Sequence, residues 1–190
     1  MPCILLTPPA AEPLTLAQAK EFLRVAHDAE DDLIAALVAG ARLHVEAQTR
    51  RALMNQTWRL TRDAWPARGR LPVLPAPLRE VVAARLRAAD GATQAIDPDA
   101  FTLDTASAPG VLAVAPDLPA PSRPVAGIEI DFAAGYGDDP DDVPEPLRLA
   151  IRLLVAHWYE NRSVIAASGA LAFFPTNVGA LLAPYRVVSL

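Results

Sequence analysis

Val143-Pro-Glu-Pro-Leu-Arg-Leu-Ala-Ile-Arg-Leu-Leu-Val-Ala-His-Trp-Tyr-Glu-Asn-Arg162 is the stretch of sequence that decides the fold of this chain. Its two prolines suit the first turn of a helix, where a missing N–H costs nothing. Glu145 adds negative charge at the positive end of the helix dipole. The spacing of one buried helical face is followed by Leu147, Ile151, Leu154, Val155 and Trp158. The stretch therefore predicts a helix packed against a core.

The same helix carries a second apolar row, formed by Leu149, Leu153 and Ala156. Its clearly polar strip is narrow and contains Glu145, Arg148, Arg152 and Tyr159. A helix with so much apolar circumference is either central in a large core or covered on a second side by another chain. We expect Leu149 and Leu153 to face a neighbouring subunit or a second packed element.

The composition limits the classes of function. With 190 residues, 52% of them hydrophobic, the chain is expected to form one domain, with room for an elaborated insert. The net charge is −5 and Lys20 is the only lysine, which argues against a protein that grips nucleic acid through its phosphates. It does not exclude a protein that lets DNA slide past. No apolar run reaches about 18 residues, so no membrane span and no membrane partner are expected.

The chain ends and the middle differ in hydrophobic period. Thr15 and Gln18 have the spacing of a capping box and predict a short helix to about Arg24, and a second helix is predicted over residues 31–51. Short alternating stretches between residues 57 and 133 predict strands, of which Ile128-Glu-Ile-Asp-Phe132 is the clearest, and Asp90-Gly91 predicts a hairpin turn. A last helix is predicted over residues 176–182.

These elements predict an α+β fold, in which N- and C-terminal helices pack together and flank a small, mostly antiparallel β subdomain. We expect residues 1–13 to form an extended N-terminal arm and residues 14–183 a single domain, with a β-rich insert over about 57–133. Residues 184–190 are expected to form an extended C-terminal tail. At least one of these two segments is expected to contact a partner, either the portal protein or an adjacent subunit.

The sequence contains no recognisable catalytic, cofactor or metal-binding motif. Its three histidines lack ligand spacing, no serine lies in a Gly-x-Ser-x-Gly elbow, and Cys3 stands alone. The acidic run at 138–142 lacks the alternation of a calcium loop, and Gly135-x-Gly137 lacks the third glycine of a nucleotide loop. We therefore expect no cofactor, no bound metal and no enzymatic activity.

A set of short motifs in order along the chain resembles the head–tail connector (adaptor) proteins of long-tailed phages and of phage-derived gene transfer agents. The motifs are Leu14-Thr-Leu-Ala-Gln-Ala-Lys20, Leu23-Arg-Val25, Asp31-Asp-Leu-Ile34, Val45-Glu-x-x-Thr49, Arg51-Ala-Leu-x-x-Gln-Thr-Trp58, Gly135-Tyr-Gly137, Val143-Pro-Glu-Pro-Leu-Arg148, His157-Trp-Tyr-Glu-Asn-Arg162 and Leu181-Leu-Ala-Pro-Tyr-Arg186. Residues 105–124 depart from the pattern, because they are unusually rich in proline and alanine.

The resemblance implies a non-enzymatic ring, commonly of twelve subunits, beneath the portal of a filled capsid. Such a ring would bind the portal protein on one side and tail or stopper proteins on the other, in the neck of a particle assembled in the bacterial cytoplasm. DNA would pass non-specifically through its middle, and an acidic lumen would repel that DNA rather than trap it. The residues expected at subunit or partner contacts are Leu149, Leu153, Arg148, Arg152, Tyr159, Arg162, Tyr185 and Arg186.

Two other hypotheses about the function remain compatible with the sequence. A small DNA-binding regulator could use the helical parts, although the acidic balance and the single lysine disfavour it. An enzyme whose site is assembled from scattered residues has no motif that would reveal it.

Overall fold

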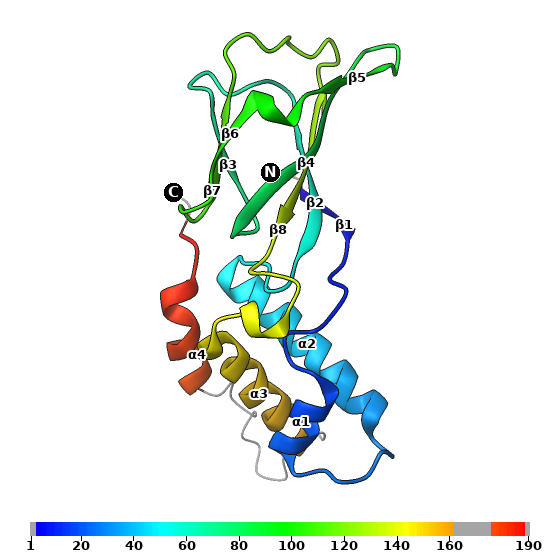
Figure 1. Ribbon diagram of the computed structural model, residues 1–190, viewed down its shortest axis with the longest axis vertical. Helices are drawn as coiled ribbons and strands as arrows, with labels where there is room; N and C mark the ends of the chain where they lie inside the picture. The colour runs from blue at the N-terminus through cyan, green and yellow to red at the C-terminus, as the bar shows by residue number, and fades with distance from the viewer. Residues whose placement is uncertain (1–2, 162–175, 189–190) are drawn as a thin grey trace, which may run out of the picture. The chain divides into compact units, whose positions relative to one another are not determined.

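The computed structural model describes residues 3–161 and 176–188, which divide into two compact units (Figure 1). The β unit comprises the described residues of Met1–Pro9, Asn55–Tyr136 and Val187–Leu190, and the helical unit comprises those of Ala10–Met54 and Gly137–Arg186. The strands pair with one another and the helices pack with one another, so each unit buries apolar surface of its own.

The β unit contains two antiparallel sheets. The first has five strands in the order β1-β2-β8-β4-β5 and the second three strands in the order β3-β7-β6. The bounds of the strands are β1 Cys3–Thr7, β2 Gln56–Arg62, β3 Arg70–Val73, β4 Leu78–Arg87, β5 Thr93–Ile96, β6 Phe101–Asp104, β7 Gly110–Val114 and β8 Ile128–Ala134. A short 3-10 turn, η1, covers Pro98–Ala100.

Strand β8 lies at the centre of the larger sheet, between β2 and β4. Its alternation directs Ile128, Ile130 and Phe132, all fully buried, to one face, and Glu129 and Asp131 to the other. The predicted hairpin at Asp90-Gly91 is confirmed, since β4 and β5 pair antiparallel across it. The core of this unit also draws on the smaller sheet through Leu71, Val73, Phe101 and Leu112.

Gly110 marks a close approach between β7 and the start of β4. A Cβ atom at this position would lie 2.4 Å from Leu78 Cβ, well inside van der Waals contact. Any side chain would force these two strands apart, so the position requires glycine.

The N-terminal segment, expected as an extended arm, is extended but paired. Residues 3–7 form β1, which runs antiparallel to β2 with Cys3 opposite Leu60 and Leu5 opposite Trp58. Three consecutive aliphatic side chains of this edge strand stay exposed: Ile4 (55%), Leu5 (41%) and Leu6 (41%). Sequence periodicity could not reveal the pairing, because the partner strand lies about fifty residues away.

The helical unit contains α1 Leu16–Leu23, α2 Asp31–Thr49, α3 Glu145–Glu160 and α4 Thr176–Leu182, with 3-10 turns η2 Pro140–Asp142 and η3 Ala183–Tyr185. Helices α1, α2 and α3 pack against one another, and α4 packs on α3. The predicted capping box is confirmed: the Gln18 amide donates to Thr15 Oγ1 at 3.2 Å, and the Thr15 amide donates to Gln18 Oε1 at 3.1 Å.

The predicted buried face of α3 is largely confirmed, because Leu147, Ile151, Leu154 and Val155 are at most 1% exposed. Trp158 is half-buried and meets the His44 ring edge-on, with 6.1 Å between ring centres. The buried face of α2 is narrow. Ile34, Val38, Ala41 and Val45 are buried, but Leu33 is 38% exposed because it lies on a different side of the helix.

The α+β class is therefore confirmed: helices from both parts of the chain pack together, and the middle supplies antiparallel strands. Among the described residues, no helix combines the length and the apolar character needed to cross a bilayer.

Candidate subunit and partner interface

The first turns of α3 carry a cluster of ion pairs. Arg148 Nε donates to Glu145 Oε2 at 2.9 Å, and the Arg148 guanidinium also pairs with Asp141. Arg152 pairs with the other oxygen of Glu145. Glu145 thus pairs with Arg148 one helical turn away and with Arg152 two turns away, so one carboxylate joins successive turns of α3.

The cluster shifts the pKa of Glu145 and the pKa of Arg148. Burial acts against ionisation of Glu145, but the guanidinium groups of Arg152 and Arg148 outweigh it and lower the pKa of this carboxyl. Burial likewise acts against the charge on Arg148, and the carboxylates of Asp141 and Glu145 outweigh it and raise the pKa of its guanidinium. Glu145 and Arg148 therefore remain charged around neutral pH, and Arg148 and Arg152 are both paired with carboxylates of their own subunit.

The other expected contact residues of α3 lie further along the helix. Leu149 and Leu153 are half-buried, on the opposite side of α3 from Leu147 and Ile151. The Tyr159 hydroxyl donates to a carboxylate oxygen of Glu30, at the start of α2. Tyr159 therefore ties two helices of the unit together rather than standing free for a partner.

Tyr185 and Arg186 lie beside the C-terminal end of α2. Arg51 Nε donates to the Tyr185 carbonyl oxygen at 2.7 Å, and Arg186 Nη2 donates to Gln48 Oε1 at 3.3 Å. Arg186 is exposed and Tyr185 is half-buried.

The structure thus brings together Arg148 and Arg152 at one end of α3, places Tyr159 at its other end, and holds Tyr185 and Arg186 at the end of α2. Arg162 lies outside the described residues. The expected residues do not form one compact site, which suits an extended contact surface better than a ligand pocket.

A charged cluster on the larger sheet was not anticipated. Asp131 accepts from Arg59 Nε at 2.7 Å and Arg59 Nη2 at 2.9 Å, and it also pairs with Arg85. Glu129 accepts from Arg87 Nε at 2.9 Å. The alternation in Ile128-Glu-Ile-Asp-Phe132 did place both carboxylates on one face, but their arginine partners come from β2 and β4, whose register only the folded sheet fixes.

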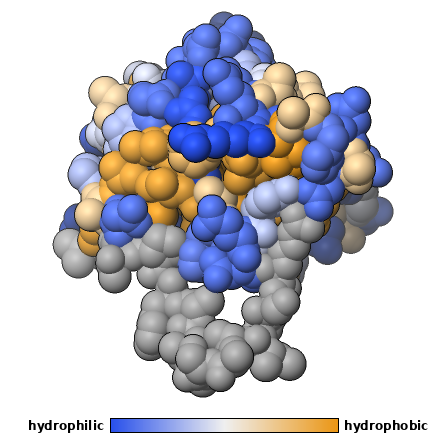
Figure 2. Space-filling view, turned by 90° about the horizontal axis from the view of Figure 1, so that it is seen from below, coloured by the Kyte–Doolittle hydropathy of each residue, from blue (hydrophilic) through white to orange (hydrophobic). Residues whose placement is uncertain are grey.

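Exposed apolar side chains occur on both units. Those of the helical unit include Phe22 (42% exposed), Leu33 (38%) and Leu43 (57%). Figure 2 shows hydrophobic surface on both sides of a hydrophilic strip in one view of the molecule. Isolated exposed leucines are ordinary, so what matters is whether such residues share one face of one element.

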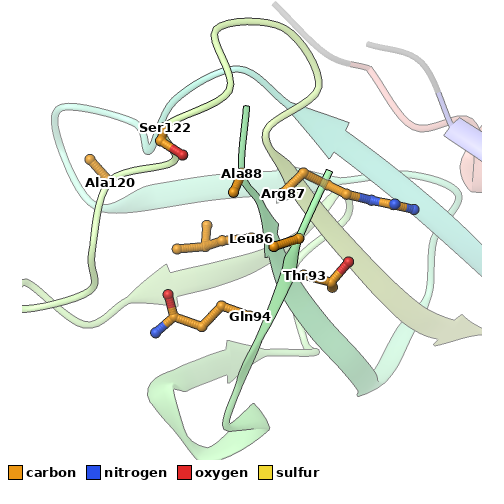
Figure 3. Close-up of a pocket in the computed structure, with 8 residues that line it drawn as sticks. Leu86, Arg87, Ala88, Thr93, Gln94, Ala120 and Ser122 are labelled. Atoms are coloured by element: carbon orange, nitrogen blue, oxygen red, sulfur yellow. The ribbon is translucent and has the colours of Figure 1, made fainter. Parts of the chain in front are cut away.

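A pocket of about 220 Å³ lies beside the β4–β5 hairpin (Figure 3). Leu86 and Gln94 extend to one side of the hairpin, toward the loop that carries Ala120 and Ser122, and Arg87 extends to the other side. The Arg87 guanidinium is bound to Glu129, and the lining offers hydroxyl groups without a base beside them. The pocket therefore lacks the arrangement of a catalytic site.

In residues 3–161 and 176–188, we find no side chains arranged to bind a metal ion and no activated cysteine. No group of three or more His, Cys, Asp or Glu side chains in these ranges could hold a metal ion. The thiol of Cys3 donates to the Leu74 carbonyl oxygen at 3.2 Å, and burial raises its pKa to about 11. Cys3 is therefore protonated at neutral pH and is a poor nucleophile.

The chain is similar over its whole length to chains of gene transfer agent particles. A chain in the virion of a native gene transfer agent (GTA) particle is 28% identical, with a TM-score of 0.82. Chains in the neck of an empty GTA particle computed with C6 symmetry and in the neck of a native GTA particle computed with C12 symmetry are also 28% identical, with TM-scores of 0.81 and 0.77. Each alignment covers 100% of this chain and 97% of the other. No protein-family model and no curated protein sequence matches the chain.

Proposed function

We propose that this protein is a structural component of the neck of a phage-like particle, where it acts as a head–tail connector. The observation that carries the proposal is the full-length match, at 28% identity and TM-scores near 0.8, to chains from the neck of a particle. Because both helical and β parts align, the similarity extends beyond a shared helical bundle. In this role the chain binds the portal protein on one side and tail or stopper proteins on the other.

The proposed assembly is a ring of about twelve copies, since the matching necks have C6 and C12 symmetry. The apolar surface left exposed on both units supports contacts with further copies. DNA passes through the ring without sequence recognition. A net charge of −5 for each subunit favours passage over retention, because it repels the phosphates.

The proposed role is structural rather than catalytic. The expected interface residues are spread over the ends of α2 and α3, and the pocket beside the β4–β5 hairpin has no paired nucleophile and base. Cys3 is held as a thiol. These features support a protein whose work is contact with other proteins in the neck, after assembly in the bacterial cytoplasm.

A deletion of the gene in the producing strain tests this function. We expect DNA-filled heads to accumulate without attached tails, and electron microscopy of gradient-purified particles measures the fraction of tailed particles. Expression of the wild-type chain in trans should restore tails, and mass spectrometry of the restored particles should detect it. Normal tailed particles in the deletion strain, or absence of the chain from restored particles, would overturn the proposal.

The C-terminal tail should contribute to attachment. Val187 is 5% exposed, whereas Val188 is 76% exposed, so removing residues 188–190 spares the hydrogen bonds of Tyr185 and Arg186. We expect this truncation to lower binding to portal-bearing heads by about tenfold or more, because an exposed apolar side chain such as Val188 is stabilised by burial on a partner. Co-sedimentation with purified tailless heads measures the binding.

The matched control for the truncation is Val125→Ala, which shortens an equally accessible valine of the β unit (64% exposed). Both variants should melt within a few degrees of wild type. Wild-type binding by the truncated chain would remove the tail from the portal contact.

A further inference from the structure

Helix α2 is unusual for a surface helix because its outward side carries no charge over four turns. Arg42 and Glu46 are the only Asp, Glu, Lys or Arg residues from Leu33 to Thr49. Both are engaged within the subunit: Arg42 donates to Glu12 and to Glu46, at 2.8 Å each. Glu46 also accepts from the Leu53 amide at 2.9 Å. The charges of α2 therefore stabilise its own unit and leave the outward side apolar.

The residues on that outward side recur at alternating intervals of three and four. We call this set the α2 row, and it consists of Leu33, Ala36, Gly40, Leu43 and Ala47. Leu33, Ala36, Leu43 and Ala47 are exposed, and Leu43 is the most accessible large residue among them at 57%. This spacing is the seam along which one helix packs on another. The buried face of α2, made by Ile34, Val38, Ala41 and Val45, is a separate face.

The small residues of the row suit a second helix at short distance. Ala36, Gly40 and Ala47 lower the surface between the two leucines, so that a facing helix could bring its side chains into the gaps. Trp158 of α3 borders the row from within the subunit: a Cβ atom at Gly40 would lie 3.6 Å from its ring. One edge of the row is therefore bordered by an aromatic side chain of the same subunit.

The lack of charged side chains in the α2 row indicates which class of partner it fits. A lipid surface or nucleic acid would call for Lys or Arg along the flanks. The flanks instead carry acidic Asp32 and Glu46 on one side and Leu37 and His44 on the other. An uncharged helical seam of this length fits a protein helix.

We propose that the α2 row binds a second copy of this chain, through a helix that lies outside the copy's own α2. The inference rests on the proposed neck function. The matching necks have C6 and C12 symmetry, so each copy has neighbours of its own kind. In a ring of more than two copies the contact joins unlike surfaces, because a face that paired with itself would close a dimer.

Photo-crosslinking in assembled particles tests the proposal. Particles are produced with p-benzoylphenylalanine at position 43, irradiated, and analysed by denaturing gel and by peptide mass spectrometry. We expect a species of twice the chain mass, with the crosslink at a residue outside α2. The control site is Val125 in the β unit, which is similarly exposed at 64% and should give far less of this species. Crosslinks to a different protein alone, crosslinks between two α2 helices, or equal yields at both sites would overturn the proposal.

A charge substitution supplies an independent readout. Leu43→Lys should lower the amount of this chain in purified particles by about tenfold or more, because a buried unpaired charge is costly at an interface. Leu43→Met, which keeps an apolar side chain, should be incorporated at the wild-type level. Both variants should fold normally, since position 43 is largely exposed.

The two hypotheses fail in different ways. If the wild-type chain itself is absent from purified particles, the neck function is wrong, and the proposal falls with it. If the wild-type chain and Leu43→Lys are incorporated equally, the α2 row is not a subunit contact, and the neck function is untouched.

Discussion

Replacement of Leu153 by glutamate is expected to exclude the chain from particles while leaving the subunit folded. Leu153 is half-buried and lies on the side of α3 away from Leu147 and Ile151, where the apolar circumference of the helix continues beyond its own core. A carboxylate there would have to be desolvated when a neighbouring subunit covers it. We expect incorporation to fall by about tenfold or more, measured by quantitative mass spectrometry of gradient-purified particles.

The adjacent residue supplies the contrasting variant. Leu154 is 0% exposed, so Leu154→Glu should prevent folding altogether, whereas Leu153→Glu should retain the helical circular dichroism of wild type. Leu153→Met, which keeps volume and apolar character, should assemble normally. Incorporation of Leu153→Glu at the wild-type level would contradict the two-sided interpretation of α3.

The second large effect is expected from Asp131→Ala in the β unit. The Asp131 side chain is 8% exposed and accepts two hydrogen bonds from Arg59, and it also pairs with Arg85. The hydrogen bond with Asp131 is the main reason that the pKa of Arg59 is raised. Removal of the carboxylate leaves Arg59, Arg85 and Arg87 with Glu129 as the one remaining carboxylate of the cluster. We expect the free energy of unfolding to fall by roughly 2–4 kcal/mol, measured by urea denaturation.

The expected loss in free energy of unfolding is smaller than for a fully buried ion pair, because the side chains of Arg59 and Arg85 are 23% and 25% exposed and can bind water. The control is Glu80→Ala, which removes an exposed carboxylate from the neighbouring strand β4 and should change the free energy by about 0.5 kcal/mol or less. If both variants lose the same stability, the cluster contributes nothing specific to the sheet.

Local signals in the sequence were sufficient for the helices and for several of the strands. Two signals act within one or two helical turns: the capping box at Thr15 and Gln18, and the prolines at the start of α3. Because they are local, they can be predicted without knowledge of the tertiary structure. The alternation over Ile128-Glu-Ile-Asp-Phe132 and the turn at Asp90-Gly91 are equally local. For this reason the α+β class followed directly from the change of hydrophobic period near residues 55 and 144.

The environment of the candidate contact residues could be predicted only in part from the sequence. The excess apolar circumference of α3 was visible from spacing, but the commitment of Arg148 and Arg152 to Glu145, and of Tyr159 to Glu30, was not. Glu30 and Tyr159 are more than a hundred residues apart, and hydrogen bonds at that separation leave no periodic trace. The α2 row was hidden for a related reason: the spacing of apolar residues does not distinguish Leu33 from Ile34, yet Leu33 is exposed and Ile34 is buried in the structure.

The sequence by itself determined the approximate positions of the helices, the alternation in β8 and the hairpin turn at Asp90-Gly91. The tertiary structure decided that β8 lies between β2 and β4, that residues 3–7 complete the sheet as β1, and that three arginines meet two carboxylates on one face. The physical reason is the separation along the chain of the residues that interact. Caps, turns and periodicity depend on neighbours a few residues away, whereas strand order and ion pairing depend on which distant segments the burial of apolar surface brings together.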